Sequence, residues 1–71
     1  MPDFTRDEVI AKAAAGESLN FTTLVGVDLH YVSLSKVNLF STNLFGADLY
    51  RANLTGANLT EANLTHALLV K

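Results

Sequence analysis

Leucine recurs at every fifth position over most of the chain. The residue two places before each leucine is usually small or β-branched, as at Val27 and Ala47, and Asn or Asp often stands between the two. A period of five fits neither the 3.6-residue period of an α-helix nor the two-residue period of an extended strand. The leucines that keep this period are expected to form a core ladder: Leu19, Leu24, Leu29, Leu34, Leu39, Leu44, Leu49, Leu54, Leu59, Leu64 and Leu69.

Each repeat predicts a very short strand followed by a turn. Alternation along a strand places the small residue and the leucine on one side and the Asn or Asp on the other, and the two remaining residues let the chain turn a corner. No five-residue unit can bury its leucine alone, so stability must come from coils stacked about 4.8 Å apart. The pattern therefore predicts an all-β solenoid.

Four consecutive repeats carry a resemblance to a known family: Ala47-Asp48-Leu49, Ala52-Asn53-Leu54, Ala57-Asn58-Leu59 and Ala62-Asn63-Leu64. They resemble the Ala-(Asp/Asn)-Leu-x-x signature of pentapeptide-repeat proteins, and the resemblance extends over residues 17–71. It implies a right-handed quadrilateral β-helix with four repeats per coil, in which residues 20 apart stack and the repeats make about 2.75 coils. Short chains of this kind look like the members found in cyanobacteria.

Residues 1–16 differ from the repeats and predict a helix. Thr5 is placed to cap its N-terminus, Glu8 completes a capping box, Phe4 and Val9 form a hydrophobic staple, and Gly16 stops it. We expect residues 1–16 to be a capping helix on a repeat domain of residues 17–71. The apolar face expected to cover the first leucines comprises Val9, Ile10, Ala13 and Ala14.

Composition and charge narrow the function classes. The 71 residues are 49% apolar and 17% charged with a net charge of −2, which excludes a disordered acidic tail and a basic nucleic-acid module. Without cysteine there is no disulfide, thiol nucleophile or cysteine zinc site. Residues 1–7 lack a signal-peptide pattern and no apolar run reaches the length of a membrane helix, so we expect a cytoplasmic protein without membrane contact.

Chemically reactive motifs are sparse. The sequence has no phosphate-binding Gly-rich loop, zinc-protease motif or nucleophile elbow, so we expect no catalytic residues and no cofactor. His30 and His66 are 36 residues apart, which places them on the order of 10 Å or more from each other, too far to share a zinc ion. We therefore expect no metal site.

The Asn and Asp positions suggest an alternative function through the family resemblance. Some members resemble duplex DNA in shape and charge and protect DNA gyrase. A duplex carries one charge per about 1.7 Å, however, and the repeats here have a net charge of only −1. The main expectation is that these side chains bond to the backbone at the turns, with the gyrase-directed DNA mimic as the alternative. The charged repeat residues are Glu17, Asp28, Asp48 and Glu61 against Lys36, Arg51 and Lys71.

Stacking at 20 residues predicts a corner that is rich in aromatic residues. It places Tyr31 beside Arg51 and His30 beside Tyr50, next to the stacked aspartates. Rings, a cation and carboxylates together are typical of binding hot spots, so these four residues are the candidate surface for an unidentified protein partner. A local cation–π ladder without a partner is the other interpretation.

The C-terminal repeat predicts a second contact surface. Leu68 stands where the repeat calls for an outward Asn or Asp, and Val70 follows on the same side. By this edge, and by resemblance to members that join through their C-terminal coils, we expect a weak twofold homodimer, unless further residues cover the edge in a longer protein. The expected function is a non-catalytic structural or protein-interaction module without direct contact to nucleic acid.

Overall fold

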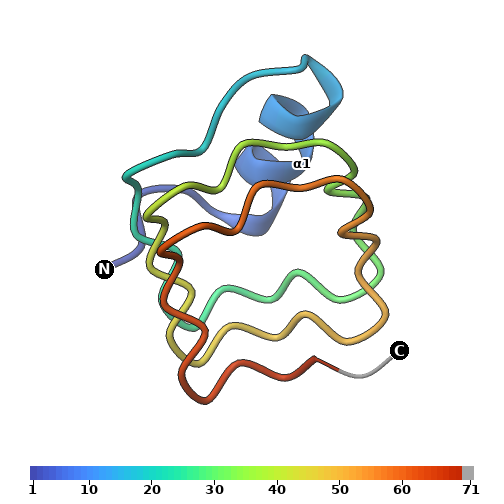
Figure 1. The fold of residues 1–71 in the computed structure, drawn as a ribbon. Helices are drawn as coiled ribbons and strands as arrows, with labels where there is room; N and C mark the ends of the chain where they lie inside the picture. The colour runs from blue at the N-terminus through green and yellow to red at the C-terminus, as the bar shows by residue number, and fades with distance from the viewer. Residues whose placement is uncertain (70–71) are drawn as a thin grey trace.

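The computed structural model describes residues 1–69, in which one helix, α1, spans Arg6–Ala14. Residues 17–69 wind in stacked coils, and α1 lies across the end of the stack that the first coil forms (Figure 1). We call residues 19–38 the first coil, residues 39–58 the second and residues 59–69 the last. Parallel β-bridges join residues 20 apart: Thr23 to Asn43, Asp28 to Asp48, Ser33 to Asn53, Asn38 to Asn58, Asn43 to Asn63, and Asp48 to Leu68.

The β structure of the described residues consists of these isolated bridges, without a continuous strand. Each bridge carries paired backbone hydrogen bonds. On one face, for example, the Leu24 N–H donates to the Asn43 carbonyl at 2.7 Å, and the Asn43 N–H donates to the Thr22 carbonyl at 2.9 Å. The short strand expected in each repeat is thus one bridge residue long, because a turn follows at once.

Every corner turns through left-handed backbone at the last residue of a repeat. Gly26, Gly46 and Gly56 adopt this conformation readily, but other residue types pay roughly 1 kcal/mol for it. Hydrogen bonds between coils hold these corners, as where the Tyr31 N–H donates to the Tyr50 carbonyl at 2.9 Å. The non-glycine corner residues, with φ between 55° and 64°, are Phe21, Tyr31, Lys36, Ser41, Arg51, Glu61 and His66.

Burial of the leucine ladder falls off toward the C-terminal end. The hydroxyl of the buried Thr42 donates to the Leu19 carbonyl at 2.8 Å, so the interior also holds a satisfied polar group. Leu69 is 50% exposed, since no further coil covers it within the described residues. The buried leucines are Leu19, Leu24, Leu29, Leu34, Leu39, Leu44 and Leu49, whereas Leu54, Leu59 and Leu64 are half-buried.

The helix begins as its sequence predicts. The Glu8 N–H donates to the Thr5 hydroxyl at 3.3 Å, and the Thr5 N–H donates to Glu8 Oε1 at 2.8 Å, which confirms the capping box. The helix ends at Ala14, and Gly16, two residues later, has a φ of 75°. This confirms the left-handed stop.

The face by which α1 contacts the first coil differs from the prediction. Val9 is fully buried, and Phe4 and Ala13 pack against the core. Ile10 is 39% exposed and Ala14 is exposed, so their expected place on the buried face is wrong. Successive helical residues are rotated by about 100°, and the helix rests on the row that holds residues 9 and 13.

The segment before α1 also bonds to the first coil. The Asp3 N–H donates to the Thr23 carbonyl at 2.8 Å, and the Thr23 N–H donates to Asp3 Oδ2 at 2.8 Å. Asp3 therefore takes the place that a preceding coil would occupy on this face. Within residues 1–69, no helix has both the length and the apolar character needed to cross a bilayer.

Candidate functional site

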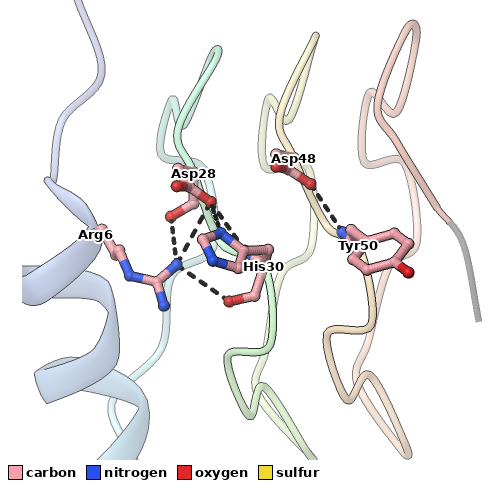
Figure 2. A network of polar contacts seen from close by, with 5 residues as sticks. All are labelled: Arg6, Asp28, His30, Asp48 and Tyr50. Carbon is pink, nitrogen blue, oxygen red and sulfur yellow. Dashed lines mark hydrogen bonds and ion pairs between the residues drawn. The ribbon is translucent and has the colours of Figure 1, made fainter.

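The Asn and Asp side chains of the repeats close turns on their own backbone. Asp48 Oδ1 accepts the Tyr50 N–H at 3.0 Å (Figure 2), and Asn43 Oδ1 accepts the Phe45 N–H at 3.1 Å. These are Asx turns, in which the side chain accepts the amide two residues ahead. The structure confirms the expected role of these side chains. The same bond, at 3.0 Å, is made by Asn38, Asn53, Asn58 and Asn63.

The turn at Asp28 additionally binds the helix. Asp28 Oδ1 accepts the His30 N–H at 3.2 Å and also contacts His30 Nδ1. From α1, the Arg6 guanidinium donates through Nη1 to the Asp28 and His30 carbonyls at 3.1 Å each, and Nη1 lies 3.5 Å from Asp28 Oδ1 (Figure 2). Arg6 thus joins α1 to the edge of the first coil.

The charge of Asp28 is stabilised by these neighbours. The His30 side chain, which hydrogen-bonds to the carboxylate, is the main cause that holds the pKa of Asp28 below its ordinary value of 3.8. The His30 backbone N–H lowers the pKa further, and the charges of His30 and Arg6 add to the effect. Asp28 therefore favours the folded state when it is ionised.

We expect Asp28→Asn to lower the melting temperature at neutral pH, because the amide keeps the turn but loses the charge that His30 and Arg6 stabilise. A lowered carboxyl pKa contributes stability that is present above the ordinary value of 3.8 and lost as the pH falls through the folded-state value. The difference between wild type and Asp28→Asn should therefore shrink on acidification. Thermal melts from neutral to strongly acidic pH measure it.

The matched control for this prediction is Asp48→Asn, which changes the equivalent turn one coil further on. Asp48 accepts the Tyr50 N–H but has no ion-pair partner among the described residues. Asp48→Asn should lower the melting temperature at neutral pH by less than Asp28→Asn does. A pH-independent difference for Asp28→Asn would contradict the assigned ion pair.

Asp28, His30 and Asp48 also form a group with the composition of a metal site. One candidate ligand atom from each lies within 4.8 Å of the others. The Asp28 oxygen that would bind a cation already accepts from His30 and faces the positive guanidinium of Arg6. Repulsion from Arg6 disfavours a cation here, so the geometry favours an ion-pair network.

The four residues of the candidate partner surface lie together at one corner, which we call the aromatic corner: His30, Tyr31, Tyr50 and Arg51. The Tyr31 ring centroid is 5.5 Å from that of His30 and 5.8 Å from that of Tyr50, both edge to face. The Arg51 guanidinium lies 5.5 Å from the Tyr50 ring centroid, and its Nε donates to the Tyr50 hydroxyl at 3.3 Å. Arg51 thus stacks on its chain neighbour Tyr50.

The other aromatic residues of the repeats form separate pairs. Phe45 lies edge to face with His66 at a centroid distance of 5.3 Å, and Phe21 with Phe40 at 5.4 Å. His66 therefore lies beside a ring, whereas His30 contacts a carboxylate. Neither pair includes a residue of the aromatic corner.

The C-terminal end exposes apolar side chains. Leu68 is 47% exposed and continues the column of Asp28 and Asp48, because its backbone bridges to Asp48. Leu69 is 50% exposed. Val70, the other residue of the expected dimer edge, lies outside the described residues.

The 20-residue spacing predicted the four residues of the aromatic corner beside Asp28 and Asp48, but the observed ring contacts differ from the predicted pairs, since Tyr31 lies against Tyr50. The contact of Arg6 and the hydrogen bond between Asp28 and His30 were not predicted. The 20-residue spacing and the turn geometry carry the signal for the group of Asp28, His30 and Asp48, since they stack the two aspartates and set His30 two residues from the first. Nothing in the repeat pattern predicts the contact of Arg6, which depends on how α1 docks.

Bridged coils with leucines inside define a β-helix repeat protein. A family model for pentapeptide repeats (8 copies) matches residues 38–71, and the chain belongs to the pentapeptide-repeat family. The 20-residue bridges begin before the matched segment, at Thr23. No curated protein sequence matches the chain.

Proposed function

We propose that this pentapeptide-repeat protein is a non-catalytic interaction module that binds a partner protein through the aromatic corner. The observation that carries the proposal is the partly exposed group of rings and a guanidinium beside Asp28 and Asp48. Tyr31 is 63% exposed, and it occupies a corner with positive φ, a position where glycine would cost less. Tyr and Arg are the residue types enriched at the energetic centres of protein interfaces.

Rigidity supports the same function. The backbone of the corner is held by the hydrogen bond from Tyr31 to Tyr50 and by the turns at Asp28 and Asp48. A surface that is ordered before binding loses less conformational entropy when a partner docks. The interior of the first two coils is filled by side chains, so binding must use the outer surface.

The proposal includes the finer architecture implied by the family. Bridges at 20-residue spacing and corners at every fifth residue support a right-handed quadrilateral β-helix of about 2.75 coils, with α1 as its N-terminal cap. A cytoplasmic location and the absence of a cofactor stay predictions from the sequence. The DNA-mimic alternative gains no support, because the stacked column of Asp28 and Asp48 ends in Leu68.

The test is capture from a lysate of the source cells with immobilised protein. The variant Tyr31→Ala/Tyr50→Ala/Arg51→Ala should capture about tenfold less of the specific partner than wild type does, because it lacks the hot-spot side chains. Phe21→Ala/Phe45→Ala removes exposed rings from other corners and should keep it. Equal capture by both variants would overturn the aromatic corner as the binding surface.

We also propose that the C-terminal end pairs with the same end of a second copy. Exposed Leu68 and Leu69 and the half-buried leucines of the last repeats support this contact. The molecule measures 27 × 24 × 23 Å, so one end offers on the order of 500 Å² per partner, in the range of weak association. A twofold pairing satisfies both copies at once.

Light scattering over a dilution series tests the dimer. Wild type should dissociate on dilution, and Leu68→Asp should be monomeric at every concentration because two carboxylates would face each other across the twofold axis. Phe45→Asp, a change of similar exposure on the side of the stack, should dissociate as wild type does. A wild type that is monomeric throughout would overturn the dimer.

A further inference from the structure

One edge of the first coil has backbone groups without a partner. The second coil shows which groups are concerned. Asn53 N–H donates to the Val32 carbonyl at 3.0 Å, the Asn53 carbonyl accepts the Leu34 N–H at 2.7 Å, and the Thr55 carbonyl accepts the Lys36 N–H at 2.9 Å. Shifted by 20 residues, the corresponding groups are the N–H and carbonyl of residue 33 and the carbonyl of residue 35, which point toward α1.

The chain itself bonds to some of the backbone groups on the other three faces of this edge. Asp3 pairs with Thr23, and Arg6 donates to the carbonyls of Asp28 and His30, while the Asp28 and Asn38 N–H groups and the Val25 carbonyl have no partner within residues 1–69. On the third of these faces, the Asn38 carbonyl accepts the Leu19 N–H at 3.0 Å. Within residues 1–69, nothing bonds to the N–H or carbonyl of Ser33 or to the carbonyl of Ser35.

A groove runs beside these groups. It has a volume of about 320 Å³ and lies between α1 and the turn after His30. A second hollow of about 200 Å³ shares Ala13 and Ser35 with it and extends it toward Asn38. Ile10 and Ala14, which point away from the core, line the groove together with Arg6, Ala13, Tyr31, Val32, Ser33 and Ser35.

We infer that this groove binds an extended segment of a partner protein, which adds to Ser33 and Ser35 as a parallel β-strand. The inference deepens the proposed function and rests on it, because it names a second contact and the kind of partner. Main-chain hydrogen bonds to an open edge provide affinity in strand addition, and the flanking groove selects side chains. The open groups here are one donor, the Ser33 N–H, and two acceptors, the carbonyls of Ser33 and Ser35. They have the spacing that one coil presents to the next.

The bonds define the bound segment. Its first carbonyl accepts the Ser33 N–H, the N–H of its third residue donates to the Ser33 carbonyl, and the N–H of its fifth donates to the Ser35 carbonyl, as Val32, Leu34 and Lys36 do for the second coil. Side chains one and three then face the helix, where Ile10 and Ala13 favour apolar groups.

The charge of Arg6 favours one type of residue directly before the bound segment. A parallel strand enters the groove at the end where Tyr31 and Arg6 lie. Arg6 is the charged residue that lines the main groove. Its Nη1 is bonded to Asp28 and His30, and the other N–H groups of its guanidinium, on a side chain that is 36% exposed, can donate to an acidic residue at the start of the segment. The partner is thus an extended segment with an acidic residue followed by alternating apolar residues.

The probe is the peptide acetyl-Glu-Val-Thr-Leu-Thr-Gly-amide, titrated to about 5 mM against the full chain, with amide hydrogen exchange measured by NMR. Before peptide is added, the Ser33 amide should exchange fast and the Asn53 amide slowly, because only the latter is paired. At about ten times the dissociation constant, exchange at Ser33 should slow roughly tenfold. A peptide with an N-methylated leucine lacks the donor to Ser33 and should give no protection.

Two protein variants locate the site. Ile10→Lys places a charge in the groove and should abolish the protection, whereas Val25→Lys changes a residue of similar exposure elsewhere and should keep it. Tyr50→Ala/Arg51→Ala should also keep it, since neither side chain lines the groove. That variant separates the two proposals: it weakens capture through the aromatic corner and leaves peptide binding intact.

Three results would overturn the strand-addition site. One is unchanged exchange at Ser33 up to about 5 mM peptide, a concentration that would reveal even weak binding. Another is equal protection by the N-methylated peptide. The third is protection of Ser33 that rises with protein concentration in the absence of peptide, which would assign the groove to a second copy of this chain.

Discussion

Leu44→Asp is expected to unfold the protein. Leu44 is fully buried in the second coil, with further coils on both sides. Burying an unpaired carboxylate costs several kcal/mol, which is comparable with the whole folding free energy of a domain this small. Circular dichroism should therefore show an unfolded chain at 25 °C and no cooperative transition on heating.

Phe45→Asp is the matched control, because it introduces the same carboxylate at the next residue. Phe45 is 41% exposed, so its substitution loses the contact with His66 but buries no charge. We expect a cooperative melt with a modestly lowered midpoint. Similar behaviour of the two variants would show that the inward and outward assignment of the repeat is wrong.

Deletion of residues 1–15 is expected to cause aggregation, the second large effect. The deletion removes Val9 from the core together with the contacts of Phe4 and Ala13, and it uncovers the leucines of the first coil. Burial of a side chain like Val9 alone contributes about 1.5–3 kcal/mol. The deletion also removes Asp3 and Arg6, which bond to the backbone edge at Thr23 and Asp28. Open backbone edges promote association between chains.

Static light scattering of the purified chains measures this effect. Deletion of residues 1–2, which are exposed, keeps every contact of Asp3 and α1 and should leave the protein monodisperse. Val9→Asp tests the core contact in the full-length chain and should lower the melting temperature strongly. A protein without residues 1–15 that stays soluble and melts as wild type does would show that α1 does not protect the first coil.

Much of the backbone follows from patterns that are local in the sequence. The five-residue period sets which residues face inward, and the Asx turns follow from Asn and Asp standing three residues before a corner residue. The capping box of Thr5 and Glu8 and the stop at Gly16 are also local, since each involves residues within one helical turn. Such features can be predicted because the interacting groups are close along the chain.

Other features depend on the corner geometry and the end of the stack. Left-handed backbone at Tyr31 or Arg51 is not apparent from residue type, because intercoil hydrogen bonds impose it. Partial exposure of Leu54 and Leu59, which have the same repeat pattern as Leu34 and Leu39, follows from their place near the last turn of the stack. Leucines at the same position of the repeat thus acquire different burial from their neighbours in space.

By itself, the sequence determined the repeat unit and the limits of α1, and the family resemblance of its repeats implied the 20-residue stacking that gathers the aromatic corner. Only the tertiary structure decided how α1 lies on the first coil. Its orientation exposes Ile10, brings Arg6 to Asp28, and leaves Ser33 uncovered. The physical reason is that a helix docks through the sum of many weak contacts between segments distant in sequence, and no period in either segment specifies that sum.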